Sequence, residues 1–207
     1  MLACGRVKSR LEAFADGVFA IAITLLVFEI KVPPSDGPLV PALLGQWAFF
    51  AAYLASFLQI GTYWVAHHIS STYIQRVNGT LLYLNLLFLF AVAFIPFPTA
   101  IAADRIGSGV DMNVAMGLYG IWMLVVAAIG SLELIVLRRD GLMDEAAFQR
   151  EAPDVLSRRF WLGSAVYAVA AVVAFVAPLV ALLFYVVAPL YYAVGTAKWH
   201  PRSRAAA

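Results

Sequence analysis

The chain has 207 residues, of which 63% are hydrophobic and only 13% are charged. Soluble domains have about a quarter of their residues charged, and apolar runs of about 20 residues, the length of a helical membrane span, recur along this sequence. These features predict an all-α integral membrane protein and exclude an ordinary soluble domain. The formal charge of +2 excludes little, because the placement of the charges matters more than their sum, and the single cysteine excludes an internal disulfide.

The first apolar segment, over residues 11–30, combines the length of a membrane span with an unusual pattern of small and polar residues. At 100° per residue, one narrow stripe of this predicted helix collects Arg10, Ala13, Gly17, Ile21, Thr24, Phe28 and Lys31. The stripe is basic at both ends, small near its start, and then carries isoleucine, threonine and phenylalanine. A helix that faces only lipid needs no such pattern. The stripe therefore predicts a helix that lines a pathway together with its copies in an oligomer.

Asp16 lies in the same segment, about 100° away from the stripe, so its side chain should point into neighbouring helices. A carboxylate inside a span is costly and normally has a partner. Arg10 is the nearest cation in sequence but lies on a different face of the helix. We therefore expect an ion pair between adjacent subunits at least as readily as one inside the helix. We favour a packing or hydrogen-bond anchor over direct ion coordination for Asp16.

Five further spans are predicted, and with the first they form one domain over residues 1–207. They cover residues 43–66, 80–103, 112–136, 160–177 and 178–196. Pro178 separates the last two spans because proline lacks the N–H that would continue a helix, and Pro96 and Pro98 should kink the outer end of the third. With both termini in the cytoplasm, twelve of the 14 Lys and Arg residues lie on the inner side, as the positive-inside rule requires.

Polar residues inside the predicted spans have structural explanations. His67 follows Trp64 at the cytoplasmic end of the second span, and we expect it to brace Asp16 or a backbone carbonyl. Asn85 should hydrogen-bond another helix. A haem or metal centre would need more ligands at one depth than His67 and His68 supply, so no cofactor is predicted.

Two features near the inner ends of the later spans complete this reading. Glu133 is expected to pair with Arg138 or Arg139, and the charged loop over residues 138–159 is expected to form a short surface helix. The sequence contains no phosphate loop, nucleophile elbow or zinc motif. It also lacks the potassium-filter sequence TVGYG and a voltage-sensing arginine ladder. Catalysis is therefore not predicted.

The start of the first span resembles a known family signature. Arg10-x-x-x-Phe14-Ala15-Asp16-Gly17 is similar to the Arg-x-x-x-Phe-Ser-Asp signature of the transmembrane protein 175 family, which comprises potassium channels of endosomes, lysosomes and prokaryotes. Further likenesses are Trp64-x-x-His67-His68, Asn85 and Pro96-Phe97-Pro98-Thr99. The resemblance covers the first three spans well and the last three mainly by topology.

This resemblance implies a prokaryotic channel with one six-span unit per chain, which assembles as a homotetramer in the plasma membrane. In the family the first helix lines the pore, a bulky aliphatic ring forms the narrowest point, and a threonine ring lies one turn beyond. These positions map to Ile21 and Thr24, with Phe28 above them and Gly17 below, and Thr24 would coordinate potassium transiently. The resemblance further implies a structural and gating network of Arg10, Phe14, Asp16, Trp64, His67 and Asn85. Ala15 replaces the signature serine, so a hydrogen bond near the pore entrance is expected to be lost.

The predicted function is a weakly selective potassium leak channel, with a hydrophobic constriction and a threonine ring in place of a filter loop. Its predicted partners are potassium ions, the bilayer and its own copies, with no cofactor and no nucleic acid. One alternative is a carrier that uses Asp16 and His67, which predicts saturable, pH-coupled flux. Another is a membrane enzyme or haem protein built on the histidine pair, which a visible absorption spectrum would reveal.

Overall fold

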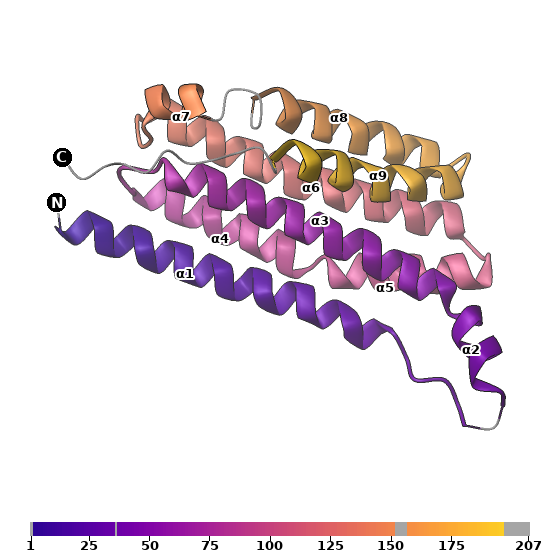
Figure 1. The fold of residues 1–207 in the computed structure, drawn as a ribbon. Coiled ribbons are helices and arrows are strands. Elements are labelled where there is room, and N and C mark those ends of the chain that lie inside the picture. The colour runs from indigo at the N-terminus through magenta and orange to yellow at the C-terminus, as the bar shows by residue number, and fades with distance from the viewer. Residues whose placement is uncertain (1, 36, 152–156, 197–207) are drawn as a thin grey trace.

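The computed structural model describes residues 2–35, 37–151 and 157–196 (Figure 1). The helices follow one another along the chain as α1 (Leu2–Leu25), the 3-10 helix η1 (Leu26–Glu29), α2 (Leu39–Gly45), α3 (Trp47–Thr72), α4 (Gly79–Ala93), α5 (Pro96–Ser108), α6 (Met112–Arg139), α7 (Glu145–Glu151), α8 (Ser157–Ala174) and α9 (Pro178–Thr196). Within these ranges, β-pairing is confined to an isolated bridge between Ile74 and Met143. The prediction of an all-α protein is confirmed.

Four helical stretches are long and apolar enough to cross a membrane. They are Arg6–Glu29, Trp47–Thr72, Gly79–Ser108 and Met112–Arg139. The apolar parts of α8 and α9, Ser164–Ala174 and Pro178–Val194, are shorter. Figure 1 shows the long helices lying alongside one another, with α2 at one end of the bundle and α7 at the other. The described chain is therefore that of a membrane protein with several apolar helices.

Prolines separate helices at the predicted places. The third predicted span is two helices, since α4 ends at Ala93 and α5 begins at Pro96, where a missing N–H costs nothing in the first helical turn. The regular helix is thus interrupted at residues 94–95, next to the prolines for which a kink is predicted. In the same way, α8 ends at Ala174 and α9 begins at Pro178. The chain thus reverses direction at Pro178, as the sequence predicted.

The main hydrophobic core joins α1, α3, α4, α5, α6, α8 and α9. Close packing of α6 on α8 depends on glycine at one position in particular. A Cβ atom on Gly120 would lie 3.0 Å from the backbone Cα of Ala171 and would also collide with the hydroxyl of Tyr185. Tyr185 is fully buried there and donates a hydrogen bond to the carbonyl of Met116 over 3.0 Å. Gly120 therefore fixes the distance between α6 and α8.

A second, smaller cluster of buried residues lies where α3, α4, α6 and α7 meet. There, Arg138 pairs with Glu145 over 3.3 Å and places its guanidinium 5.1 Å from the ring centre of Phe148. The expected surface helix is thus present as α7. The expected pairing of Glu133 is wrong, because no ion pair among the described residues joins it to Arg138 or Arg139.

Candidate functional site: the first helix and its polar network

The helix α1 has two opposite faces. One face packs on α3 and α4 and buries Leu11, Ala15, Phe19, Ala22 and, just beyond the helix, Leu26. Ala15, which stands in the place of the signature serine, is 0% exposed. The position of the missing hydroxyl therefore lies on the packed face of α1 in one protomer, and the expected effect of its loss at the pore entrance stays a prediction.

The other face of α1 carries the predicted stripe and is open. Ile21 is 61% exposed, Phe28 in η1 is 77% exposed, and Thr24 and Arg10 are exposed as well. A Cβ atom on Gly17 would have no neighbour within 4 Å outside its own helix. The described part of one protomer thus leaves a continuous line of side chains uncovered, which runs the length of an apolar helix.

Thr24 has a defined orientation on this face. Its hydroxyl lies 3.0 Å from the carbonyl oxygen of Ala20 and 2.9 Å from that of Ile21, and donates to these two acceptors of its own helix. Threonine commonly satisfies its hydrogen in this way inside helices. The hydroxyl oxygen consequently keeps its lone pairs for a ligand on the exposed side.

Asp16 finds its partner on α3, but the partner is not a cation. The indole Nε1 of Trp64 donates a hydrogen bond to Asp16 Oδ1 over 2.8 Å. Both side chains are exposed in the protomer, and Trp64 also stacks on His68 with 5.5 Å between ring centres. The side chain of Asp16 does point to a neighbouring helix, as predicted. An ion pair with Arg10 is absent from the described part of the protomer, where both Arg10 and Phe14 stay exposed.

His67 does not brace Asp16. Its Nε2 lies 2.8 Å from Oδ1 of Asn85 on α4, and both residues are buried. Because an amide oxygen only accepts, Nε2 carries the hydrogen. The imidazole ring also stacks on Phe88 at 5.9 Å and contacts Phe19 of α1 at 5.8 Å. The expected bond between Asn85 and another helix is confirmed, and it ties α3 to α4 directly behind α1.

Replacing Asn85 alone should therefore destabilise the folded protein more than replacing both Asn85 and His67 by apolar residues. Asn85→Leu leaves a buried N–H of His67 without an acceptor, which costs about 1–3 kcal/mol. We expect a clear drop in the thermal unfolding midpoint in detergent micelles. Adding His67→Phe to Asn85→Leu should restore most of the lost unfolding temperature, because two apolar side chains leave no buried donor without an acceptor. A double variant as unstable as the sum of the two single variants would contradict this pairing.

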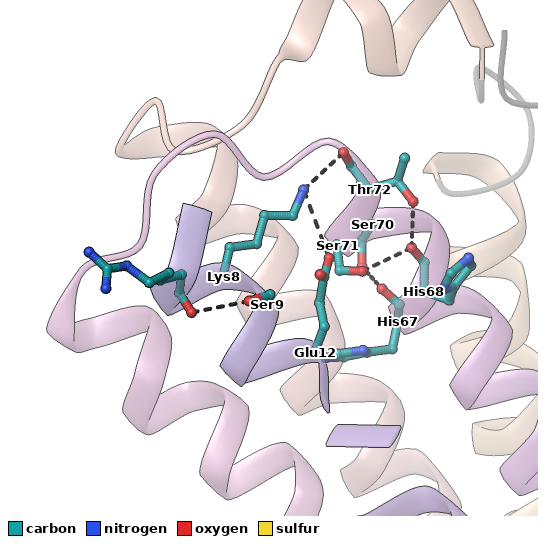
Figure 2. Close-up of polar contacts among 9 residues, drawn as sticks. Lys8, Ser9, Glu12, His67, His68, Ser70, Ser71 and Thr72 are labelled. Carbon is teal, nitrogen blue, oxygen red and sulfur yellow. Dashed lines mark hydrogen bonds and ion pairs between the residues drawn. The ribbon is translucent and has the colours of Figure 1, made fainter. Parts of the chain in front are cut away.

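The N-terminal end of α1 is anchored by contacts that the sequence did not reveal (Figure 2). Lys8 donates to the carbonyl of Thr72, the last residue of α3, over 3.2 Å, and lies 3.8 Å from Glu12 one turn along. A cation at the C-terminal end of a helix satisfies an orphan carbonyl and the helix dipole. The spacing of Lys8 and Glu12 is visible in the sequence, whereas the contact with Thr72 joins residues 64 positions apart.

Metal ligation finds little support in this geometry. No group of three or more His, Cys, Asp or Glu side chains within the described residues is placed to hold a metal ion. His67 already uses Nε2 for Asn85. His200, the third histidine of the sequence, lies outside the described residues.

Known proteins resemble this chain over most of its length. A protein named as a potassium channel from Streptomyces collinus is 42% identical over 170 residues, which are 81% of this chain and 82% of the relative. Another, from Chamaesiphon minutus, is 37% identical over 171 residues, 80% of this chain and 83% of the relative. The mouse endosomal/lysosomal proton channel TMEM175 is 40% identical over 99 residues, which cover 43% of this chain and 20% of that protein.

The likeness extends to structure, and the family model covers the part of the chain that holds the site. The crystal structure of a lysosomal potassium-selective channel TMEM175 homolog from Chamaesiphon minutus matches with a TM-score of 0.80 at 33% identity, and covers 92% of this chain and 98% of that one. The family model described as the endosomal/lysosomal potassium channel TMEM175 matches residues 10–96. That range holds the open stripe of α1 from Arg10 onward, Asp16 with Trp64, and His67 with Asn85. The chain belongs to the TMEM175 channel family.

Proposed function

We propose that this chain forms a homotetrameric, potassium-permeable channel in the plasma membrane, with α1 lining the pore. The observation that carries the proposal is the open stripe of α1, opposite the face that packs on α3 and α4. Such a line of side chains within a span would need cover from lipid or from another chain. Four copies around a common axis would cover each other and leave Ile21, Thr24 and Phe28 facing the axis. The relatives named as potassium channels support the same function.

In this proposal each chain contributes six spans in a single domain, with both termini in the cytoplasm. The helices α8 and α9 supply the two shorter spans, and α4 with α5 supplies the broken one. Shorter helices reach across when the bilayer thins locally or when they associate with others. The excess of Lys and Arg at one end of the bundle sets the orientation.

Two rings would govern conduction in this pore. Four Ile21 side chains offer no oxygen to replace an ion's water, so they form a constriction that closes by dewetting. The Thr24 ring lies about 4.5 Å further along the axis, at a rise of about 1.5 Å per residue. An ion that passes the first ring meets the hydroxyl oxygens of the second at once. The result would be weak selectivity for potassium without a filter loop.

Asp16 and Arg10 would act between subunits. Among the described residues of one protomer, Asp16 accepts a hydrogen bond from a neutral donor, Trp64, and neither Asp16 nor Arg10 makes an ion pair. An ion pair across the subunit boundary would compensate both charges within the membrane's inner half. The hydrogen bond from Trp64 would then orient the carboxylate toward the adjacent copy.

Native mass spectrometry and single-channel recording together test the proposal. The purified wild-type protein should be a tetramer in mild detergent and should conduct potassium in planar bilayers under a potassium gradient. Asp16→Asn should reduce the tetramer fraction, because breaking a desolvated ion pair costs about 3–5 kcal/mol per pair. A monomer that conducts would overturn the pore model. Saturable, pH-coupled flux without unitary currents would favour a carrier.

A further inference from the structure

A cavity of about 290 Å³ lies away from α1, between α3, α6, α8 and α9. Its walls include Tyr63 and Ala66 of α3, Ala127 of α6, Tyr167 of α8 and Ala188 of α9. Tyr63 and Ala127 each lie more than two turns from either end of a helix long enough to span the membrane. The cavity therefore lies at the depth of the lipid acyl chains, on a different side of α3 from the packing with α1.

Three hydroxyl groups in the cavity wall donate their hydrogens to acceptors within the protein. The Tyr63 hydroxyl donates to the carbonyl of Met123 over 2.8 Å, and the Tyr167 hydroxyl donates to Oε1 of Gln59. Thr62 donates to the carbonyl of Leu58 in its own helix over 2.8 Å. A buried water needs two to four polar partners, and these three hydrogens are not available to it. The cavity is thus suited to an apolar occupant.

The cavity also opens on the exposed side of α9. Phe184, Val187 and Tyr191 of α9 form part of its lining and are 39%, 58% and 56% exposed. These side chains continue the apolar outer surface of α9 directly into the cavity. An empty space of this size would forfeit the dispersion contacts of every wall atom. Lipid is the apolar material present at this depth.

We infer that this cavity binds the acyl chain of a bilayer lipid. The chain enters beside Val187 and lies against the aromatic wall formed by Tyr63 and Tyr167. A second copy of the protein is the other conceivable cover for this face, and the experiment below separates the two. The binding site does not depend on the proposed pore.

A contact route leads from the cavity wall to α1. The ring of Tyr63 meets Phe88 of α4 edge-on at 6.3 Å, and Phe88 contacts Phe19 of α1 at 6.1 Å. Because interiors are close-packed, a shift of Tyr63 when the cavity fills is felt by its ring neighbours. If α1 lines the pore, as proposed above, occupancy of the cavity changes conduction. This second part rests on the proposed function.

Photo-crosslinking in vesicles tests the binding site directly. The full-length protein is reconstituted into phosphatidylcholine vesicles that contain a phospholipid with a diazirine in one acyl chain, and labelled peptides are mapped after illumination. We expect label on Tyr63 and Tyr167, which are buried inside the protomer, as well as on the exposed Val172. Ala188→Phe fills the cavity and should lower labelling of Tyr167 at least tenfold, while labelling of Val172 stays unchanged.

Matched variants guard against a fold defect. Ala128→Phe makes the same change on α6 at an exposed residue outside the described cavity lining, and it should leave the label on Tyr167 intact. Ala66→Leu fills the cavity from α3 and should repeat the effect of Ala188→Phe. Competition by an unlabelled free fatty acid at equal concentration would identify a free acid as the preferred source of the chain. Competition by unlabelled phospholipid alone would identify the bilayer lipid.

Clear outcomes would overturn the inference. Absence of label on both Tyr63 and Tyr167 in the wild-type protein would show that no acyl chain enters the cavity. Equal labelling of Tyr167 in the wild type and in all variants would show the same. Crosslinks from Val187 to another chain would show that a second copy covers the opening. Potassium flux from the same vesicles tests the coupling: an unchanged flux after the label is lost contradicts the route to α1. A wild type without potassium flux contradicts the proposed function and leaves the labelling result standing.

Discussion

Replacing Ile21 with asparagine is expected to raise the potassium leak of the reconstituted channel about tenfold, equivalent to about 1.4 kcal/mol off the conduction barrier. Four branched apolar side chains keep water out of the proposed constriction, whereas four amides supply oxygens and hydrogens that hold water in it. Ile21 is 61% exposed on the protomer, so the substitution disturbs none of its core. Conductance and reversal potential in planar bilayers under potassium and sodium gradients measure the effect.

Two further variants decide whether the stripe itself is responsible. Thr24→Val keeps the shape but deletes the hydroxyl oxygen, so the preference for potassium over sodium should fall while the tetramer stays intact. Val18→Asn introduces the same amide on α1 at a partly buried position off the stripe, and it should change the leak little. A reduced flux for Ile21→Asn, or an effect of Val18→Asn as large as that of Thr24→Val, would show that α1 does not line a pore in this orientation.

Replacing Gly120 with leucine should prevent the protein from folding normally. Its side chain would have to occupy the space of the Tyr185 hydroxyl and of the Ala171 backbone. A side chain can move aside but the backbone of α8 cannot move without separating the two helices, so we expect a loss of about 3 kcal/mol or more. Size-exclusion chromatography and thermal unfolding in detergent should show little folded protein.

A second glycine provides the control for Gly120. Gly61 lies in the interior of α3, and a Cβ atom there meets nothing within 4 Å in the protomer. Gly61→Ala should therefore leave the folded protomer intact, and the better helix propensity of alanine even favours it. If Gly120→Leu unfolds no more readily than Gly61→Ala, the close approach of α6 and α8 is not what holds this part of the bundle.

The helices of this protein could be predicted from their sequence because their signals are local. Apolar length located the helical segments, and Pro96 and Pro178 marked breaks that any helix must respect. The two faces of α1 followed from periodicity alone, since Ala15 and Phe19 fall opposite Ile21 and Thr24. The extent of α1 was less well predicted. It begins at Leu2, before Arg10, in a stretch that lies outside the long apolar run and therefore gave no span signal.

The partners of the polar residues could not be predicted, because they depend on the relative rotation of packed helices. Asp16 accepts from Trp64, which is 48 positions away, and His67 meets Asn85, which is 18 positions away. A sequence shows that such residues need partners, and the simplest prediction for a charged residue is the nearest residue of opposite charge along the chain. The structure satisfies both with neutral donors and acceptors instead. The same reasoning misplaced Glu133, for which proximity along the chain predicts a pair with Arg138 or Arg139.

The orientation of the Thr24 hydroxyl has a consequence for the sign of the permeant charge. Its hydrogen is held by the carbonyls of Ala20 and Ile21, so in the proposed tetramer the four oxygens present lone pairs to the axis and withhold their hydrogens. A cation that sheds water finds acceptors at this level. Chloride would need donors and finds none. The pore would therefore reject anions through the direction of four hydrogen bonds, without any charged side chain at this level.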